Sequence, residues 1–455
     1  MNFQSTLMKK INQLLILTLL FWGMFFTSCN KKSTTATVYV PVAGEWVGTI
    51  SVFSSGNDTT LQRFLDGNYN TITGSLEIAT SAQIDYRKYF ANLKVINGSL
   101  ILYKFPYTDL SFAPGVRKIT GNLHLSYCPE LNSLNGLAQL DTLGGALMLD
   151  SNPKIKNCQG LEQIKALTDI LINGNNSLQS FSGLDNVTSL SHNLSITNTP
   201  LLTSLAGLEG IELITGGIYL SGNPLLSSLS GMPGLVKLPG ILSLTSLPAL
   251  TDLTGLNTIK DTINSILISN CNKIKDLAGL DQLSRITKDL KLVDCTNIAN
   301  LQGLAKVDTI GGLTELNKLP AFTSFTGFNS LKTIKKDFRI FNCNSLTSLT
   351  GLHNLVRING SFVIDNNPSL INVMGLDSLK FITGDLQILE CNNLTSLAGL
   401  NSVKSIYGNL DIYYNAKLTN FCALKPDTIR QRIYIGLNSY NPTWTMLKTG
   451  TGCKQ

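Results

Sequence analysis

Charged side chains are scarce in this 455-residue chain, in which Asp, Glu, Lys and Arg together make up 14%. Setting Lys9 and Lys10 of the N-terminal segment aside lowers the formal net charge from +7 to +5. The remaining lysines are scattered, whereas a nucleic-acid binder gathers its basic residues into a patch or stripe. The composition therefore excludes nucleic acid from the expected partners.

Histidine is rare as well. The three histidines, His124, His192 and His353, fall on different repeat units and at different positions within the unit. No CxxC pair and no Cys/His spacing typical of a metal site occurs. A catalytic triad needs a base beside its nucleophile, and these isolated histidines offer no such grouping. We therefore expect no metal, no cofactor and surface positions for the three histidines.

A strict internal repeat is what the sequence does contain. The unit 386–412 carries apolar residues at fixed positions. Earlier copies of this unit precede it along the chain at a spacing of 24 residues, with a few spacings of 23. A period this long indicates a solenoid, here of about fifteen coils. Each coil opens at one of these positions: Leu76, Leu100, Leu123, Leu147, Ile170, Leu194, Ile218, Leu242, Ile266, Leu290, Thr314, Phe338, Phe362, Leu386, Leu410 and Ile433.

The two halves of each unit predict different structures. The opening Leu-x-Ile alternates apolar and polar residues, which is the pattern of a strand with two side chains pointing inward. The second half returns an apolar residue every third position but is short, rich in Ser, Thr and Asn, and interrupted by a Gly-Leu pair such as Gly399–Leu400. We expect extended and turn segments there, and hence a mainly β fold of stacked parallel coils.

The N-terminus resembles a bacterial lipoprotein signal. Lys9 and Lys10 precede an apolar run over 11–26, and small residues lead to Cys29. The run is shorter than the roughly 20 residues that a membrane span needs. The resemblance implies cleavage before Cys29 and attachment of lipid to it; a plain N-terminal anchor helix is the alternative.

The ends of the array need covers, because a terminal coil exposes an apolar face. An alternating stretch over 46–53 predicts a strand, and Thr59–Gln62 resembles a capping box that opens a short helix through Leu65. We accordingly divide the chain into a signal peptide (1–28), a lipid-anchored tether (29–45), an N-terminal cap (46–75), the solenoid (76–421) and a C-terminal cap (422–455).

The repeat itself resembles known families. The spacing of Leu386, Ile388, Cys391 and Leu394 is similar to a leucine-rich-repeat signature. Together with the Gly-Leu segment it resembles the receptor L domain, a leucine-rich-repeat-like right-handed β-helix of receptor ectodomains and bacterial envelope proteins. This resemblance covers about 59–453 and implies a fold, while leaving the ligand open.

Most cysteines occupy one slot of the repeat, the fifth position after the opener, where sister coils carry Asn or Leu. This slot predicts buried packing, with Asn bonding to neighbouring backbone and Cys filling space. A bridge between Cys271 and Cys295 on adjacent coils is open, although stacked strand positions rarely suit disulfide geometry. Cys422 and Cys453 lie outside the repeat slots and bracket the last coil, as in bacterial proteins of the resembled type, so we expect a disulfide between them.

The strongest catalytic candidate is a charged run on the outward face of the strands. Lys291, Glu315 and Arg339 fall on consecutive coils, flanked by Asp289, Asp337 and Asp385. A ladder of ion pairs between neighbouring strands, a binding site and a catalytic site are the three interpretations of this run.

Aromatic side chains gather toward the C-terminal end of the same face. Phe341, Tyr413 and Tyr434 point outward if the strand alternation holds, and with Arg339 they are the candidate binding residues. Tyrosine-rich patches serve in recognition. Packing against the C-terminal cap is the alternative role for these rings.

These features favour a lipid-anchored protein of the bacterial cell envelope, at the outer membrane, facing either the periplasm or the outside. We expect a monomeric, non-catalytic scaffold that binds a protein or glycan and contacts the membrane through its N-terminal lipid. A surface polysaccharide-active β-helix enzyme and a passive structural protein are the alternatives.

Overall fold

The computed structural model of the protein describes residues 44–53 and 59–452. The expected signal peptide, the lipid-attachment residue Cys29 and nearly all of the tether lie outside these residues. None of the helices in the described part has the length and hydropathy that crossing a membrane requires.

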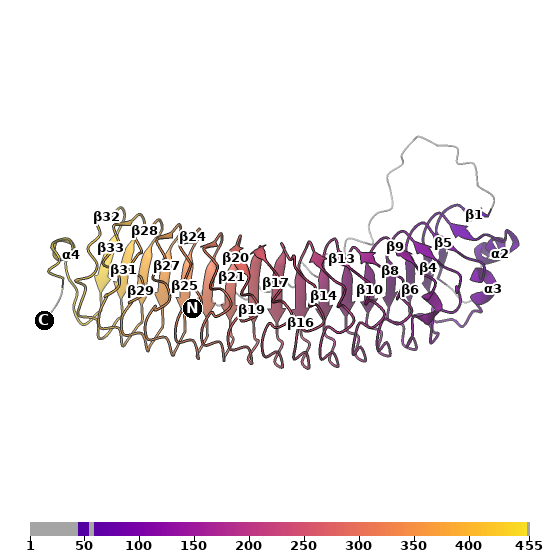
Figure 1. Ribbon diagram of the computed structural model, residues 1–455, viewed down its shortest axis with the longest axis horizontal. Coiled ribbons are helices and arrows are strands. Elements are labelled where there is room, and N and C mark those ends of the chain that lie inside the picture. Colours follow the sequence, from indigo (N-terminus) through magenta and orange to yellow (C-terminus); the bar gives the residue numbers. More distant parts are fainter. Residues whose placement is uncertain (1–43, 54–58, 453–455) are drawn as a thin grey trace, which may run out of the picture. The chain divides into compact units, whose positions relative to one another are not determined.

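One long parallel sheet contains the first strand of every coil, and its strands follow one another in chain order from the indigo to the yellow end of Figure 1. The strands pair at the predicted register, so that Leu386 lies beside Leu410. They are β2 (Ile50–Val52), β4 (Leu76–Ala79), β6 (Leu100–Tyr103), β8 (Leu123–Ser126), β10 (Leu147–Asp150), β12 (Ile170–Asn173), β14 (Leu194–Thr197), β16 (Ile218–Ser221), β17 (Ile241–Thr245), β19 (Ser265–Ser269), β21 (Leu290–Val293), β23 (Thr314–Asn317), β25 (Phe338–Phe341), β27 (Phe362–Asp365), β29 (Leu386–Leu389), β31 (Leu410–Tyr413) and β33 (Ile433–Gly436).

Shorter strands form the second side of the coil, also parallel and, apart from a register shift between Asp261 and Thr262, in register. They fall into three groups because their pairing is interrupted twice. The groups are β1 (Glu45–Trp46), β3 (Thr71–Ile72), β5 (Val95–Ile96), β7 (Lys118–Ile119) and β9 (Thr142–Leu143); β11 (Ala166–Leu167), β13 (Ser189–Leu190) and β15 (Leu213–Ile214); and β18 (Asp261–Ile263), β20 (Leu283–Ile286), β22 (Thr309–Ile310), β24 (Thr333–Ile334), β26 (Arg357–Ile358), β28 (Phe381–Ile382), β30 (Ser405–Ile406) and β32 (Thr428–Ile429).

The fold is therefore a mainly β solenoid of about sixteen stacked parallel coils, close to the fifteen or so that the 24-residue period predicts. The strand residues Leu386 and Ile388 point inward and are buried, while Gln387 between them is half-buried on the outer face. The apolar residues of the second half are buried as well: Leu394, Leu397, Leu400, Val403 and Ile406. Every coil adds its inward side chains to a single continuous core, so each unit is stabilised by its neighbours.

The second half of each coil has extended and turn backbone, as expected, and its Gly-Leu pairs form a tight corner. From Gly160 to Gly399 the glycines at this corner have positive φ, for example 104° at Gly303 and 113° at Gly351. A Cβ added at Gly303 would overlap the backbone carbonyl group of Leu277 in the preceding coil. Only glycine fits a position that combines this backbone conformation with such close stacking of chains.

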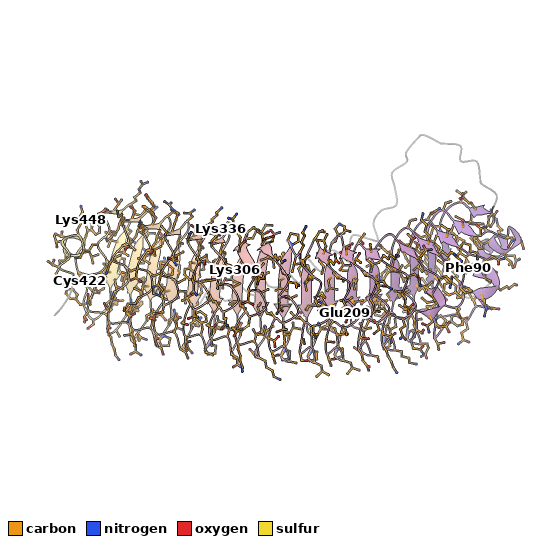
Figure 2. All side chains as sticks on the ribbon, viewed as in Figure 1. Phe90, Glu209, Lys306, Lys336, Cys422 and Lys448 are labelled. Carbon is orange, nitrogen blue, oxygen red and sulfur yellow. The ribbon has the colours of Figure 1, made fainter. Side chains whose placement is uncertain are left out.

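Two helices and a group of aromatic side chains close the N-terminal end of the stack. The helix α2 (Thr59–Asp66) forms where it is predicted and buries Leu61 and Phe64. Phe64 packs against Trp46 (ring centroids 6.0 Å apart) and Phe90 (5.3 Å). Phe90 ends a second helix, α3 (Arg87–Phe90), and marks this end of the stack in Figure 2.

The single strand predicted over 46–53 is wrong in one respect. The chain turns at Gly48, whose φ is 107°, so that β1 and β2 join two different sheets. Alternation of apolar residues continues across this corner because both flanking strands face the same core. The pattern therefore carried no sign of the bend.

A short helix, α4 (Trp444–Thr449), closes the C-terminal end, near Cys422 and Lys448 in Figure 2. The hydroxyl of Thr443 accepts from the backbone N–H of Met446 and caps the helix, and Gly450 ends it with a φ of 74°. Cys422 is disulfide-bonded. Its predicted partner, Cys453, lies outside the described residues, so the pairing stays a prediction.

The structure also contains a short 3-10 helix, η1 (Asn135–Leu137).

Candidate binding surface

The outer face of the long sheet, here called the sheet face, presents one row of side chains from the middle of each strand and a second row from its end. Arg339 and Tyr434 lie in the first row, and Phe341 and Tyr413 lie in the second. None of the four belongs to the core, as the strand alternation predicts: Arg339, Phe341 and Tyr413 are half-buried, and Tyr434 is exposed. Parallel register holds each row at a spacing of about 4.8 Å from coil to coil.

The charged run places Lys291, Glu315 and Arg339 side by side on adjacent strands. Among the described residues no ion pair joins Glu315 to either neighbour; Arg339 instead binds Asp337 of its own coil, with Nη2 2.6 Å from Oδ2. Within this described run, the ladder of ion pairs between neighbouring strands is therefore absent, and the one ion pair lies within a single coil. The position of the Arg339 side chain is set by Asp337, two residues earlier in the same coil. A pattern that compares equivalent positions of neighbouring coils does not predict such a contact.

The flanking aspartates have a structural role. Their Oδ1 atoms accept hydrogen bonds from backbone N–H groups of the following coil: Asp289 from Leu313 (2.9 Å), Asp337 from Ser361 (2.9 Å) and Asp385 from Asn409 (2.7 Å). Carboxylates held in this way join the coils together at the entry to the strand. Their regular recurrence in the sequence is accounted for by this contact.

Three tyrosines form a compact group at the C-terminal end of the sheet face, here called the tyrosine platform. The ring of Tyr413 packs edge-on against Tyr414 and Tyr434, with both centroid distances 5.3 Å. Tyr414 is 49% exposed and Tyr434 is 44% exposed. Burial, together with the carboxylates of Asp411 and Asp365, raises the pKa of Tyr413.

The structure brings only two of the four predicted binding residues together. Tyr413 and Tyr434 are on neighbouring strands, whereas Arg339 and Phe341 lie on β25, three strands away from β31. Three strand spacings correspond to roughly 14 Å. Tyr414 completes the platform, and the strand alternation alone did not place it there because it follows the end of its strand.

A column of residues with left-handed backbone runs beside the second row. One residue of this corner column follows each long strand from β6 to β33, with φ near 50–65°: Lys104, Tyr127, Ser151, Gly174, Asn198, Gly222, Ser246, Asn270, Asp294, Lys318, Asn342, Asn366, Glu390, Tyr414 and Leu437. This conformation suits Gly and Asn and costs other L-residues about 1–2 kcal/mol. The column turns its side chains out of the corner and toward solvent.

A shallow hollow in the described surface follows this corner column over five coils. It has a volume of about 490 Å³ and is here called the corner groove. Its lining comes from the corner column and from the position two residues later: Asn270, Asn272, Asp294, Thr296, Lys318, Pro320, Asn342, Asn344 and Asn366. The groove was not predicted from the sequence, although Asn recurs on both sides of the buried slot.

The slot between the two sides of the groove is buried as predicted, and its asparagines tie the coils together. Oδ1 of Asn367 accepts from the backbone N–H of Cys343 (2.9 Å), and its Nδ2 donates to the carbonyl groups of Ile340 and Asp365 (3.0 Å each). Asn415 repeats the arrangement on Cys391. Each buried amide thus satisfies backbone groups of two coils.

Six cysteines are buried free thiols, five of them in the slot: Cys128, Cys158, Cys271, Cys295, Cys343 and Cys391. The adjacent pair Cys271 and Cys295 is not bridged. Burial raises the pKa of the Cys158 and Cys271 thiols to about 12. Only roughly one such thiol in ten thousand is ionised at about pH 8, and the thiolate is the reactive form.

We therefore expect the folded chain 30–455 to resist a disulfide-exchange reagent such as dithionitrobenzoate at about pH 8. The same six thiols should react fully once the protein is unfolded in guanidinium chloride, which supplies the internal control. Absorbance of the released thiolate measures both. Reaction of the folded protein at the rate of a free peptide cysteine would contradict the burial described here.

The histidines remain separate from one another. His192 and His353 are exposed and lie 3.2 Å from Asp169 and 3.0 Å from Asp377. Burial lowers the pKa of His124. Within the described part of the chain, no group of three or more His, Cys, Asp or Glu residues could hold a metal ion.

Comparison with models of known protein families finds no match, and comparison with curated proteins finds none either. Among solved structures, the TLR13–ssRNA13 complex matches with a TM-score of 0.26 and 16% sequence identity. The match covers 76% of this chain and 64% of that one, so this chain spans less than two thirds of the length of that structure. At this level of similarity the match bears neither on the fold nor on the function.

Proposed function

We propose that this protein is a lipid-anchored, non-catalytic binding scaffold of the bacterial cell envelope, with a solenoid of the receptor L-domain type. The repeat array supports the proposal because stacked coils hold a long surface rigid. Binding to such a surface does not have to order the protein first, so the entropic cost of association is reduced.

The tyrosine platform is the observation that carries the proposal. Tyr413, Tyr414 and Tyr434 fix one another by edge-on contacts yet remain half-buried or exposed. Tyrosine supplies a large amphipathic contact area with few rotatable bonds, and clusters of it dominate many interfaces. The platform is therefore the expected centre of contact with a protein or glycan partner.

Replacing all three tyrosines by serine is expected to remove most of the binding while the fold is retained. Sister coils already carry serine at the three equivalent places, for example Ser269, Ser246 and Ser243. The chain 30–455 and its variant would be used as bait on envelope extracts, with bound protein and bound carbohydrate quantified separately. A loss of at least about tenfold in captured partner is expected, the size typical for loss of aromatic contacts at an interface.

A matched control is the variant Tyr103→Ser/Tyr127→Ser. These two tyrosines also pack edge-on, with centroids 5.7 Å apart, and are exposed, but they lie toward the other end of the stack. Capture should be unchanged in this variant. Equal losses from both variants, or no loss from the platform variant, would count against the platform.

The membrane part of the proposal rests on the lipoprotein-like leader. Cys29→Ser is expected to move the protein from the membrane fraction to the soluble fraction, because a lipid chain gives about 0.8 kcal/mol of anchoring per buried methylene. Protease treatment of intact cells would then distinguish the periplasmic side from the outside. Retention of the variant in the membrane would favour an uncleaved anchor helix instead.

A further inference from the structure

The corner groove has the chemistry of a site for neutral polyhydroxyl ligands. Five of its nine lining residues are asparagines, and its only two charges neutralise each other, because Lys318 Nζ lies 3.2 Å from Asp294 Oδ1. An amide group offers two N–H donors and a carbonyl acceptor, which is what adjacent hydroxyl groups of a sugar require. A lining with no net charge gives no electrostatic preference for phosphates or acidic sugars.

Part of this hydrogen-bonding capacity is already used, and part of it is free. Asn366 Nδ2 donates to Asn342 Oδ1 (2.7 Å), and Asn342 Nδ2 donates to Asn317 Oδ1 (3.1 Å), which holds these amides in place. The side-chain amides of Asn270 and Asn344 make no hydrogen bond to another described residue. The groove thus combines amides held in place with the solvent-exposed amides of Asn270 and Asn344.

The shape of the groove favours an elongated, periodic ligand. Its corner residues repeat once per coil over five coils, from Asn270 to Asn366, a span of roughly 20 Å at strand spacing. The corner column then continues through Glu390 to Tyr414 of the tyrosine platform. A chain lying in the groove would reach aromatic rings that can stack on the apolar face of a sugar ring.

A peptide fits this groove less well. Extended peptides that add to a sheet bind through main-chain hydrogen bonds to an unpaired strand edge. Here the strands flanking the groove, β19 to β27, are paired on both sides. Pro320 is the single apolar residue of the lining, so pockets for peptide side chains are lacking as well.

We propose that the corner groove binds a neutral, unbranched polysaccharide segment that runs across the coils and ends on the tyrosine platform. This inference rests on the proposed binding function and names its ligand class. The asparagines bind the hydroxyl groups, the paired Asp294 and Lys318 favour uncharged sugars, and Tyr414 contacts the terminal sugar ring.

The test measures binding of neutral hexasaccharides by calorimetry, using maltohexaose, cellohexaose, xylohexaose and mannohexaose, with hexagalacturonate as the charged counterpart. The protein is compared with the variant Asn270→Gly/Asn342→Gly/Asn366→Gly. Gly174 and Gly222 occupy the same corner with φ of 65° in sister coils, so glycine preserves the fold while the amides are removed. At least one neutral hexasaccharide should bind, and the variant should weaken it by about tenfold or more.

Ser151→Gly/Ser246→Gly is the matched control, because it makes the same change in the corner column outside the groove. It should leave the affinity unchanged, and melting curves should show that both variants fold. The proposal is overturned if no neutral hexasaccharide binds, if hexagalacturonate binds more tightly, or if the groove variant binds as well as the control. A captured protein whose binding the groove variant abolishes would also overturn it.

Failure of this inference leaves the proposed function separately testable. Capture that depends on the tyrosine platform but not on the groove amides would retain a recognition scaffold and discard the groove. If capture depends neither on the tyrosine platform nor on the groove amides, both proposals are wrong.

Discussion

Replacing Gly303 by alanine is expected to lower the free energy of unfolding by about 3–5 kcal/mol, among the largest effects of any single methyl group in this chain. The residue has a φ of 104°, which L-residues rarely adopt, and its new Cβ would overlap the backbone of Leu277 and Ala278 in the coil before it. Backbone cannot move aside as a side chain can, so two coils have to separate. Urea unfolding followed by circular dichroism measures the loss.

The site of the damage is expected to be local. Each coil contacts only its neighbours, so a defect at one corner weakens one junction of the array. Amide hydrogen exchange should therefore accelerate most in the coils that contain Leu277 and Gly303. A uniform increase along the whole solenoid would contradict nearest-neighbour stacking.

Gly174→Asn is the matched control, since it also replaces a glycine of positive φ. Gly174 belongs to the corner column, where Asn198 occupies the same position in the next coil and no backbone atom lies within close reach of an added Cβ. Asparagine tolerates this conformation, so a change of less than about 1 kcal/mol is expected. A large loss here would mean that positive φ alone, and not overlap with the preceding coil, explains the glycines.

Asn367→Ala is expected to lower the free energy of unfolding by about 2–4 kcal/mol. The side chain is fully buried and makes three hydrogen bonds to backbone, one as acceptor from Cys343 and two as donor to Ile340 and Asp365. Alanine would leave these backbone groups buried without partners, and each unsatisfied group costs about 1–3 kcal/mol. Urea unfolding measures the stability, and exchange of the Cys343 amide proton reports the broken contact.

The conservative comparison is Asn367→Cys, because Cys343 and Cys391 occupy this slot in the coils on either side. The thiol fills most of the space, and the Sγ of Cys391 donates to the carbonyl group of Leu389 in its own coil (3.3 Å). We expect a loss of less than half that of the alanine variant. Equal losses would show that the hydrogen bonds matter and the filled volume does not.

Local pattern was sufficient where one residue type satisfies one repeated environment. Leu386 and Ile388 alternate with a polar residue, recur every 24 positions and are buried at the predicted register. The fifth-position slot was predicted to be buried from its mixture of Cys, Asn and Leu, and Cys295 and Asn415 are both fully buried. In each case equivalent residues of neighbouring coils stack on one another. The repeat in the sequence therefore predicts which residues are in contact in the folded protein.

Prediction was less successful where a residue depends on contacts outside the repeat. Three features depend on local contacts that are not part of the repeat. They are the turn at Gly48, the helix α4 and the ion pair of Arg339 with Asp337. The candidate site shows the same division. Tyr413 and Tyr434 were placed on the outer face correctly, but their grouping with Tyr414 depends on ring packing across the end of two strands.

By itself, the sequence determined the number of residues per coil and the inward positions, because burial acts on every coil alike. Only the tertiary structure decided which side chains meet on the outside. A left-handed residue at each corner turns Asn270, Lys318 and Asn366 toward the same hollow. Solvent-exposed side chains have several rotamers of similar energy, and the choice among them depends on neighbours from other coils that no periodic rule specifies.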